Sequence, residues 1–407
     1  MDSDESLVIP PLGKEHHVWH IPEDAPVSRS RRSRGNGEYE STIPISLADL
    51  RFVFPSELLA DCEEASCALA SFDAYAAAKL GEGSHVLGPM SAVLLRTEAS
   101  SSSQIENLTV GAKNLALETI DEGTSDNAAV VVGNVRAMEA ALKLGDSMTE
   151  NNILAMHEAL LSAQRGWGKY AGTYRTNLVW VGTDGYSPRG AAHVGPQPEL
   201  IAGAMADLLE FIERDDLSVV AQCAIAHAQF ETIHPFLDGN GRLGRLLITL
   251  MLCDSGILKA PILYLSLFFK VHRQEYYRLL SDVRSTGDWE AWLSYFLEAV
   301  TLTSRQAVTT ARQIARQISD DRKIIEQTGR SSATTLLIFE CFTRKLIADS
   351  KYIVAETGLS PATVNSGLAR LQELYIVSEI TGKKRDKIYS YARCMEVLNQ
   401  ELDYDTE

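Results

Sequence analysis

The twelve residues from His234 to Arg245 constrain this chain more than any other segment of it. They read His-Pro-Phe-Leu-Asp-Gly-Asn-Gly-Arg-Leu-Gly-Arg, and an apolar run follows directly. Apolar side chains recur at helical spacing in that run, at Leu243, Leu246, Leu247, Leu250 and Met251. The sequence therefore predicts a buried helix that begins near Gly241.

The first turn of this predicted helix has the chemistry of an anion-binding site. Its backbone N–H groups have no partners within the helix, the helix dipole is positive there, and Gly239 and Gly241 let a ligand approach the main chain. Arg242 and Arg245 share one face of this turn, where positive side chains are unfavourable unless an anion lies beside them. Guanidinium groups suit phosphate oxygens, so the pattern predicts a site for a di- or triphosphate.

Two ionisable residues before the helix complete the predicted chemistry. Asp238 offers a hard carboxylate that can hold Mg²⁺ between two phosphates. His234 ends the preceding helical pattern, residues 221–233, and its ordinary pKa lies near neutrality, so it can accept a proton from an incoming hydroxyl. The segment thus predicts a polyphosphate, a metal ion and a proton acceptor in one place.

Three other interpretations of these residues stay open from their pattern alone. The glycines have the G-x-G-x-x-G spacing of a dinucleotide-binding loop, but that loop follows a β-strand and residues 224–231 have a helical pattern. His227, Glu231 and His234 have the helical spacing of metal ligands, although no further Cys or His cluster completes a site, and a packed His227 is the simpler interpretation. A glycine-rich turn with solvated arginines before an ordinary helix is the third.

The twelve residues match the motif of the Fic family, His-Pro-Phe-x-Asp/Glu-Gly-Asn-Gly-Arg-x-x-Arg, at every fixed position. The chain is therefore similar to enzymes that transfer AMP from ATP to a serine, threonine or tyrosine hydroxyl of a target protein and release pyrophosphate. The resemblance implies a general base at His234 and a Mg²⁺ ligand at Asp238. It implies phosphate contacts by five further residues: Gly239, Asn240 and Gly241 in an anion hole, Arg242 on the α- and β-phosphates, and Arg245 on the γ-phosphate. The choice of AMP over phosphoryl transfer comes from the family alone.

Upstream, Ser102-Ser-Gln-Ile-Glu106-Asn107 resembles the inhibitory motif Ser/Thr-x-x-x-Glu-Gly/Asn of one class of Fic proteins. Four-residue spacing places Ser102 and Glu106 on one helix face. In that class the glutamate pairs with the second motif arginine, here Arg245, so that ATP binds in an orientation unsuited to attack. The same stretch also fits a capping box, Ser103-x-x-Glu106, for a helix that begins there.

Two further segments resemble the parts of the family that bind the target and the adenine. The stretch after Gly172-Thr-Tyr-Arg175 predicts two short strands and resembles the hairpin flap on which relatives lay an extended target segment. The flap residues expected to dock a target are Val179, Trp180, Val181 and Val194. A later helix resembles the one that holds adenine, although ordinary core aromatics are the alternative there. The residues expected to contact the base are Tyr277, Leu280 and Arg284.

Length and composition fit a globular protein of several domains, because 407 residues with 45% hydrophobic content can form two or three cores. The resemblance implies that this protein is mainly α-helical. The expected fold is a Fic-type helical bundle core with a β-hairpin flap, followed by a C-terminal winged helix domain. The expected divisions are a flexible polar arm at 1–38, a helical extension with the inhibitory motif at 39–125, the catalytic core at 126–300, a connecting helix at 301–328, and the winged helix domain with an acidic tail at 329–407.

The expected arm contains an arginine-rich run, Arg29-Ser-Arg-Arg-Ser-Arg34, and shows no hydrophobic periodicity. We therefore expect a loosely held, solvated segment, and contact with an acidic surface or nucleic acid is the alternative. The net charge of −16 argues against broad, nonspecific nucleic-acid binding by the whole chain. With no apolar stretch of membrane-spanning length and no signal peptide pattern after Met1, we expect a cytoplasmic protein without a membrane partner.

Residues 352–374 predict a helix, a tight turn and a second helix, with Gly358 in the turn and Ser360 and Pro361 beginning the second helix. Two strands, 376–380 and 388–391, then flank a basic loop, and the whole resembles a winged helix-turn-helix. The residues expected to meet DNA are Thr363, Asn365, Ser366, Arg370, Lys383, Lys384 and Arg385. Because the second helix has few positive charges, protein interaction or dimer docking is an equal alternative.

Two classes of function follow from the sequence. The first is an autoinhibited adenylyltransferase with ATP as substrate, Mg²⁺ as cofactor, a protein target that includes the chain itself, and a homodimer as its assembly. The second is a DNA-binding transcriptional regulator that uses the Fic part as a nucleotide sensor. The intact His234 favours catalysis, since a sensor needs the phosphate contacts without the base. Relatives with an inhibitory glutamate also remove AMP, so the direction of transfer stays open.

Overall fold

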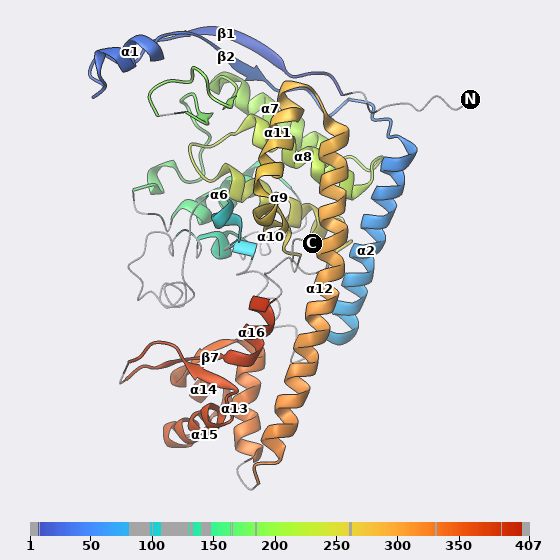
Figure 1. Cartoon of the computed structure of the whole chain (residues 1–407), viewed down its shortest axis with the longest axis vertical. Helices are drawn as coiled ribbons and strands as arrows, with labels where there is room; N and C mark the ends of the chain where they lie inside the picture. The colour runs from blue at the N-terminus through green and yellow to red at the C-terminus, as the bar shows by residue number, and fades with distance from the viewer. Residues whose placement is uncertain are drawn as a thin grey trace. The chain divides into compact units, whose positions relative to one another are not determined.

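The structure is a computed structural model, and it is mainly helical (Figure 1). The residues that it describes are 7, 9–80, 98–99, 101–106, 130, 133–138, 140, 148–162, 164, 166–183, 185–259, 263–329, 332–383 and 385–400. The chain divides into two compact units. The first contains Met1–Ser66, Gly133–Ile257 and His272–Val300, and the second contains Cys67–Val132, Leu258–Val271 and Thr301–Glu407. Each unit is described by itself below.

The core of the first unit is built around helix α8. This helix, Val219–Ile233, is buried from Val220 onward, because most of its residues are apolar and its buried polar side chains, such as Gln222, His227 and Gln229, are hydrogen-bonded within the core. It packs against α7 (Pro198–Ile212), α9 (Asn240–Asp254) and α11 (Arg273–Ser285). The Trp292 indole at the start of α12 (Trp289–Glu326) donates to the Ala224 carbonyl at 3.0 Å. α8 therefore fixes the position of the segment that begins at His234, directly after its C-terminus.

Short elements surround this core in the first unit. Helix α6 (Glu150–Ser162) contacts α7, α9 and the single 3₁₀ turn η1 (Gly168–Tyr170). Strands β3 (Trp180–Val181) and β4 (His193–Val194) pair antiparallel and form the two short strands that were predicted around a turn-rich stretch. Helix α2 (Ser56–Leu80) begins in the first unit and continues into the second.

The described part of the N-terminal arm is ordered, which corrects the prediction of a loosely held segment at residues 1–38. Strand β1 (Gly13–Trp19) pairs antiparallel with β2 (Gly37–Ile43), and helix α1 (Arg29–Gly35) lies between them in the chain. The arginine run is partly structural, because Arg32 donates to the backbone carbonyls of Ile21, Glu23 and Ala25 at 2.8–3.2 Å. Apolar periodicity could not reveal this order, since backbone pairing and arginine–carbonyl bonds create it.

In the second unit, α10 (Leu265–Val271) begins beside a buried carboxylate. The Ser266 backbone N–H donates to Glu98 Oε2 at 3.0 Å, and the Ser266 hydroxyl donates to the other oxygen. Residues 98–99 and 101–105 are helical. Glu98 therefore joins this short helical stretch to the positive end of α10, where a carboxylate is favourable.

The C-terminal part of the second unit contains four helices and a small sheet. The helices are α13 (Ser332–Arg344), α14 (Ser350–Thr357), α15 (Pro361–Glu373) and α16 (Ala392–Gln400). The strands β5 (Ile347–Asp349), β6 (Val377–Glu379) and β7 (Ile388–Tyr391) form an antiparallel sheet in the order β5-β7-β6. Gly358 and Ser360 cap α14 and α15 as predicted, with Gly358 at φ 67°. The sequence did not predict the three-residue β5.

A buried carboxylate ties this C-terminal part to α12 within the second unit. Asp321 is fully buried, accepts a hydrogen bond from the Tyr391 hydroxyl at 2.6 Å, and pairs with Arg393. These elements are the ones expected of a winged helix-turn-helix, and that assignment stays a prediction. Over the described part of the chain, no helix combines the length and the apolar character needed to cross a membrane.

Candidate active site

The loop between α8 and α9 begins with a backbone conformation that residues other than glycine rarely adopt. His234 caps the end of α8 in the left-handed region, at φ 49° and ψ 59°. Arg175 holds it there, because its Nε donates to the His234 carbonyl at 2.8 Å and its own backbone N–H donates to the Pro235 carbonyl at 2.9 Å. Strain of this kind persists only where the surroundings over-determine it, so the loop is pre-organised.

The His234 imidazole is neutral at neutral pH. Burial, with the guanidiniums of Arg284 and Arg175 nearby, lowers its pKa to about 4. Its Nδ1 lies 3.4 Å from the Glu231 carbonyl oxygen, an acceptor, so Nδ1 carries the proton in this arrangement. About 20% of the side chain stays exposed. The arrangement leaves Nε2 as a proton acceptor that a ligand can reach.

The rest of the loop is closed by Asn240 and turned by Gly239. The Asn240 amide accepts from the Phe236 N–H at 2.9 Å and donates to the Phe236 carbonyl at 2.8 Å, so its side chain shapes the loop. Gly239 has φ 83°, and a Cβ there would lie 2.9 Å from Leu160 Cδ2. Only glycine fits this position, which directly precedes the N–H groups of the first turn of α9.

Both motif arginines are buried beside this loop. The Arg242 side chain is 2% exposed and donates to Asp238 Oδ2 at 2.9 Å. Arg245 is 3% exposed and hydrogen-bonds the Tyr276 hydroxyl, which also lies 2.8 Å from His227 Nε2. His227 is thus packed in the core, where burial lowers its pKa to about 3. The structure brings the predicted base, carboxylate and two guanidiniums to one end of α8 and α9.

His157 of α6 belongs to this site and was missed from the sequence. Its Nδ1 accepts the Gly172 N–H at 3.0 Å, so its Nε2 is the donor to the Asp238 carbonyl at 3.1 Å. Its ring stacks on Phe236 with centroids 3.7 Å apart, and burial lowers its pKa to about 4. No local pattern marks this role, because His157 lies on an apolar helix face and its partner is 81 residues away.

The residues predicted to dock a target do not share one environment. Trp180 packs edge to face against Trp19 at 5.2 Å, whereas Val181 is 47% exposed. Val194 is buried, and the Val179 carbonyl accepts the Gly195 N–H within the hairpin. Strands β1 and β2, which we call the N-terminal hairpin, therefore contact both flap strands, with Trp19 against Trp180 of β3 and β2 beside β4. The sequence did not indicate these contacts.

The residues predicted to contact adenine also differ in their exposure to solvent. Tyr277 is 43% exposed under Arg273, while Leu280 is buried in the core. Arg284 is half-buried, and its Nε lies 3.4 Å from the Thr232 hydroxyl. Among the described residues, these three form no single stacking face, so the adenine pocket stays a prediction.

The inhibitory segment lies in the second unit. Ser102 is buried, and Glu106 occupies the turn that ends the short helix, with its N–H donating to the Ser103 carbonyl. The capping-box alternative is wrong, because the Ser103 hydroxyl donates to the Ala99 carbonyl one turn earlier at 2.9 Å. Asn107 lies outside the described residues. Arg245 belongs to the first unit, so its pairing with Glu106 stays a prediction.

Three of the seven residues predicted to meet DNA have side-chain partners within the domain. The Thr363 hydroxyl contacts Ser360, Asn365 accepts from Ser350, and Arg370 pairs with Glu373 at 2.8 Å. Ser366 and Arg385 are exposed, Lys383 is half-buried, and Lys384 lies outside the described residues. DNA binding by this domain stays a prediction.

Comparison with known families assigns the central part of the chain. Residues 147–252 match the Fic/DOC family, and residues 59–143 match the N-terminal region of that family. The chain carries a Fic/DOC domain. This Fic/DOC domain includes α6, the flap, α8 and most of α9, and so contains the whole loop from His234 to Arg245.

Two curated relatives show how far the likeness extends. The chain is 30% identical over 153 residues to protein adenylyltransferase fic-1 of Caenorhabditis elegans, which covers 37% of this chain and 27% of the relative. It is 28% identical over 171 residues to probable protein adenylyltransferase aq_aa38 of Aquifex aeolicus (strain VF5), which covers 40% and 50%. The matches thus span between about a quarter and a half of these relatives.

A solved Fic family protein from Desulfovibrio desulfuricans G20 has the same fold. It aligns with a TM-score of 0.55 and 22% identity over 83% of this chain and 97% of its own. The alignment supports the mainly helical architecture with the Fic bundle at its centre.

Proposed function

We propose that this protein is an adenylyltransferase that transfers AMP from ATP to a hydroxyl group of a protein target, itself included. The observation that carries the proposal is the neutral, partly exposed His234 held in a strained conformation beside two buried arginines and the N-terminus of α9. The named relatives are adenylyltransferases and support the same chemistry.

In the proposed reaction, a target hydroxyl oxygen bonds to the α-phosphorus of ATP. The bond from that phosphorus to the oxygen bridging to the β-phosphate breaks, and pyrophosphate leaves. His234 Nε2 accepts the hydroxyl proton, since Nδ1 faces the Glu231 carbonyl. The N–H groups at the start of α9 and the guanidiniums of Arg242 and Arg245 bind the phosphate oxygens.

The residues at the loop fit one Mg²⁺ ion. The Asp238 side chain is 34% exposed, and only its Oδ2 accepts a hydrogen bond from a described residue. Mg²⁺ is commonly held by one or two carboxylates together with substrate phosphates and water. Asp238 Oδ1 would be the protein ligand, and the ion would neutralise charge on the phosphates. No described group of three or more His, Cys, Asp or Glu side chains forms a separate metal site.

We further propose that Glu106 inhibits the reaction by pairing with Arg245 and occupying the γ-phosphate position. Two observations support this. Glu106 ends a short helix whose first described residue, Glu98, is fixed to α10 by two hydrogen bonds. Arg245 is a buried guanidinium at the predicted phosphate site. A charge-assisted pair in a partly dry site is strong enough to displace a phosphate contact.

The proposal predicts that Glu106→Gly raises AMP transfer to the chain or to a lysate target by at least about tenfold. His234→Ala in that background should reduce transfer by a factor of about 10² or more, the usual contribution of a general base. Protein-bound nucleotide after incubation with ATP and Mg²⁺ is read by mass spectrometry.

Glu158→Gly is a matched control, because Glu158 lies on α6 and makes no described salt bridge. It should leave transfer unchanged. Equal labelling of the wild type and Glu106→Gly would contradict the inhibition. Full labelling of the Glu106→Gly/His234→Ala protein would contradict the assignment of the base.

A further inference from the structure

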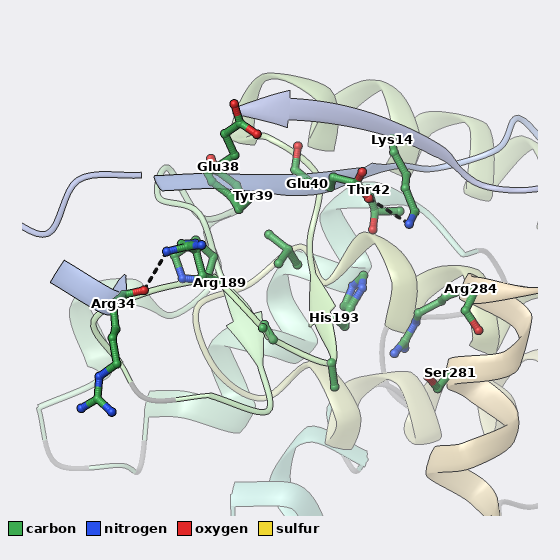
Figure 2. A pocket seen from close by; sticks show the side chains of 17 residues that line it. Lys14, Arg34, Glu38, Tyr39, Glu40, Thr42, Arg189, His193, Ser281 and Arg284 are labelled. Carbon is green, nitrogen blue, oxygen red and sulfur yellow. Dashed lines mark hydrogen bonds and ion pairs between the residues drawn. The ribbon is translucent and has the colours of Figure 1, made fainter. Parts of the chain in front are cut away.

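One pocket lies between β2, the flap and α11 (Figure 2), and a second pocket adjoins it between α1 and the turn of the flap, both within the first unit. Their volumes are about 580 and 460 Å³, and they share Arg34 and Arg189. We define the basic surface as the five cationic residues that line them: Lys14, Arg31, Arg34, Arg189 and Arg284. The motif loop, residues 234–245, contributes none of the lining residues.

The N-terminal hairpin and α1 hold the turn of the flap through several hydrogen bonds. The Ser187 hydroxyl donates to the Gly35 carbonyl at 2.7 Å, and Arg189 donates to the carbonyls of Arg34 and Asn36 at 2.8 and 2.6 Å. On the other strand, the Trp19 indole donates to the Tyr186 carbonyl at 2.8 Å. The flap therefore has a fixed position relative to the hairpin, and both pockets are preformed.

Gly37 allows the Arg189 guanidinium to lie close to the backbone at the start of β2. It has φ 128°, and a Cβ there would lie 3.2 Å from the Arg189 guanidinium carbon. A side chain at this position would both strain the start of β2 and push Arg189 away. The local sequence is thus suited to holding Arg189 between the two pockets.

The lining charge favours an anionic ligand. The basic surface brings five cations together, while only Glu38 and Glu40 among the lining residues are acidic. Glu40 pairs with Lys14 at 2.9 Å, and both side chains stay largely exposed. In a chain with net charge −16, this local excess of positive charge attracts acidic partners.

One end of the basic surface reaches the catalytic histidine. The Arg284 guanidinium is close enough to lower the pKa of His234, and burial lowers its own. Its Nε donates to the Thr232 hydroxyl at 3.4 Å, and the nearby Glu231 carboxylate partly offsets the effect of burial on its pKa. His193, which lines the same pocket, lies 6.3 Å from His234 between ring centroids. A segment bound here would pass beside the proposed base.

We propose that the basic surface binds an extended, acidic segment of the target protein and that the N-terminal hairpin thereby selects the target. The role in target selection rests on the proposed function, but binding of the acidic segment does not require AMP transfer. The larger pocket lies along β2 and the flap strand β4, and the smaller one continues from it past Arg34 and Arg189 to α1 and the flap turn, so a segment in extended conformation fits the two better than a single small anion.

The test measures binding of two short fluorescent peptides to the full chain. One alternates aspartate with glycine, and the other has asparagine in place of aspartate. The aspartate peptide should bind at least about tenfold more tightly at low salt, and the advantage should shrink as salt screens the charges. Equal affinity for the two peptides would overturn the proposal.

Lys14→Gln/Arg34→Gln should remove most of the advantage, because it deletes two lining charges. The only described side-chain bond that it breaks is the exposed Lys14–Glu40 pair, so folding should be unaffected. The control, Lys169→Gln/Arg29→Gln, removes the same charges outside the pockets and should keep the full advantage. An equal loss in the control would overturn the proposal.

The same variants are tested for binding of ATP with Mg²⁺ in the Glu106→Gly background. Lys14→Gln/Arg34→Gln should leave the ATP dissociation constant within about twofold of the parent, since the motif loop does not line the pockets. A loss of ATP affinity as large as the loss of peptide affinity would assign the basic surface to the nucleotide and overturn the proposal. Peptide binding without any AMP transfer would contradict the proposed function alone.

Discussion

The motif loop and the basic surface both use arginines, and they use them in opposite ways. Arg242 in the loop and Arg175 beside it are almost completely buried and are fixed by a carboxylate and by backbone carbonyls, respectively. On the basic surface, most cations are exposed and the pockets between them are open. Buried, hydrogen-bonded groups set one geometry and are costly to disturb, whereas exposed charges act over a distance and are screened by salt. The loop therefore suits the proposed transfer reaction, and the surface suits the proposed choice of a target.

Substitution of His157 should give the largest effect on the loop. His157→Ala removes two hydrogen bonds and a stacked ring from a buried position, which should cost about 2–4 kcal/mol of the loop's stability. Hydrogen exchange of the backbone amides of residues 236–241 measures this cost directly, and their exchange rate should rise far more than that of the amides in β2. Unchanged protection of these amides would mean that His157 does not hold the loop.

His157→Phe separates the two contributions, because phenylalanine keeps a ring against Phe236 but makes neither hydrogen bond. Its cost should be smaller than that of alanine, while AMP transfer should still fall because the Asp238 carbonyl loses its donor. If transfer by His157→Phe matched the wild type, ring packing alone would account for the role of this residue.

A smaller, graded effect should appear on acidification, again at the loop. His157 and His234 have a pKa of about 4 in the folded chain, against 6.5 when unfolded. Between these values the unfolded state binds more protons, so stability is complete above about pH 6.5 and falls as the pH drops toward about 4. Exchange protection of α8 should therefore weaken between pH 7 and pH 5.

Helix α7 serves as the reference in this measurement, since it contains no histidine. Its protection should change less than that of α8 over the same range. Equal loss in both regions would show that acidification acts on the whole unit, and constant protection of α8 would contradict the buried neutral histidines.

The sequence predicted the residues of the loop because they are neighbours in the chain. A helix pattern, two glycines and a fixed order of ionisable groups were enough to place His234, Asp238 and both arginines at one helix terminus. Asn240 shows the limit of such reasoning, because its amide closes the loop on Phe236. Whether a polar side chain faces a ligand or its own backbone depends on a turn geometry that residue order does not determine.

Contacts between distant segments escaped prediction for a different reason. His157 hydrogen-bonds Asp238, which is 81 residues away in the chain, and Ser187 hydrogen-bonds Gly35, which is 152 residues away. The N-terminal arm looked solvated because it lacks apolar periodicity, yet backbone pairing and the Arg32 bonds to carbonyls order it. Polar contacts of this kind depend on the finished fold, so a pattern of hydrophobic residues gives no sign of them.

In the proposed reaction, the loop from His234 to Arg245 directs attack at the α-phosphorus of ATP. Incubating Glu106→Gly with Mg²⁺ and ATP labelled either at the α- or at the γ-phosphate distinguishes this reaction from phosphoryl transfer. The α-label should become bound to protein, and the γ-label should leave with pyrophosphate. Protein-bound γ-label with free α-label would show phosphoryl transfer and would rule out the proposed reaction.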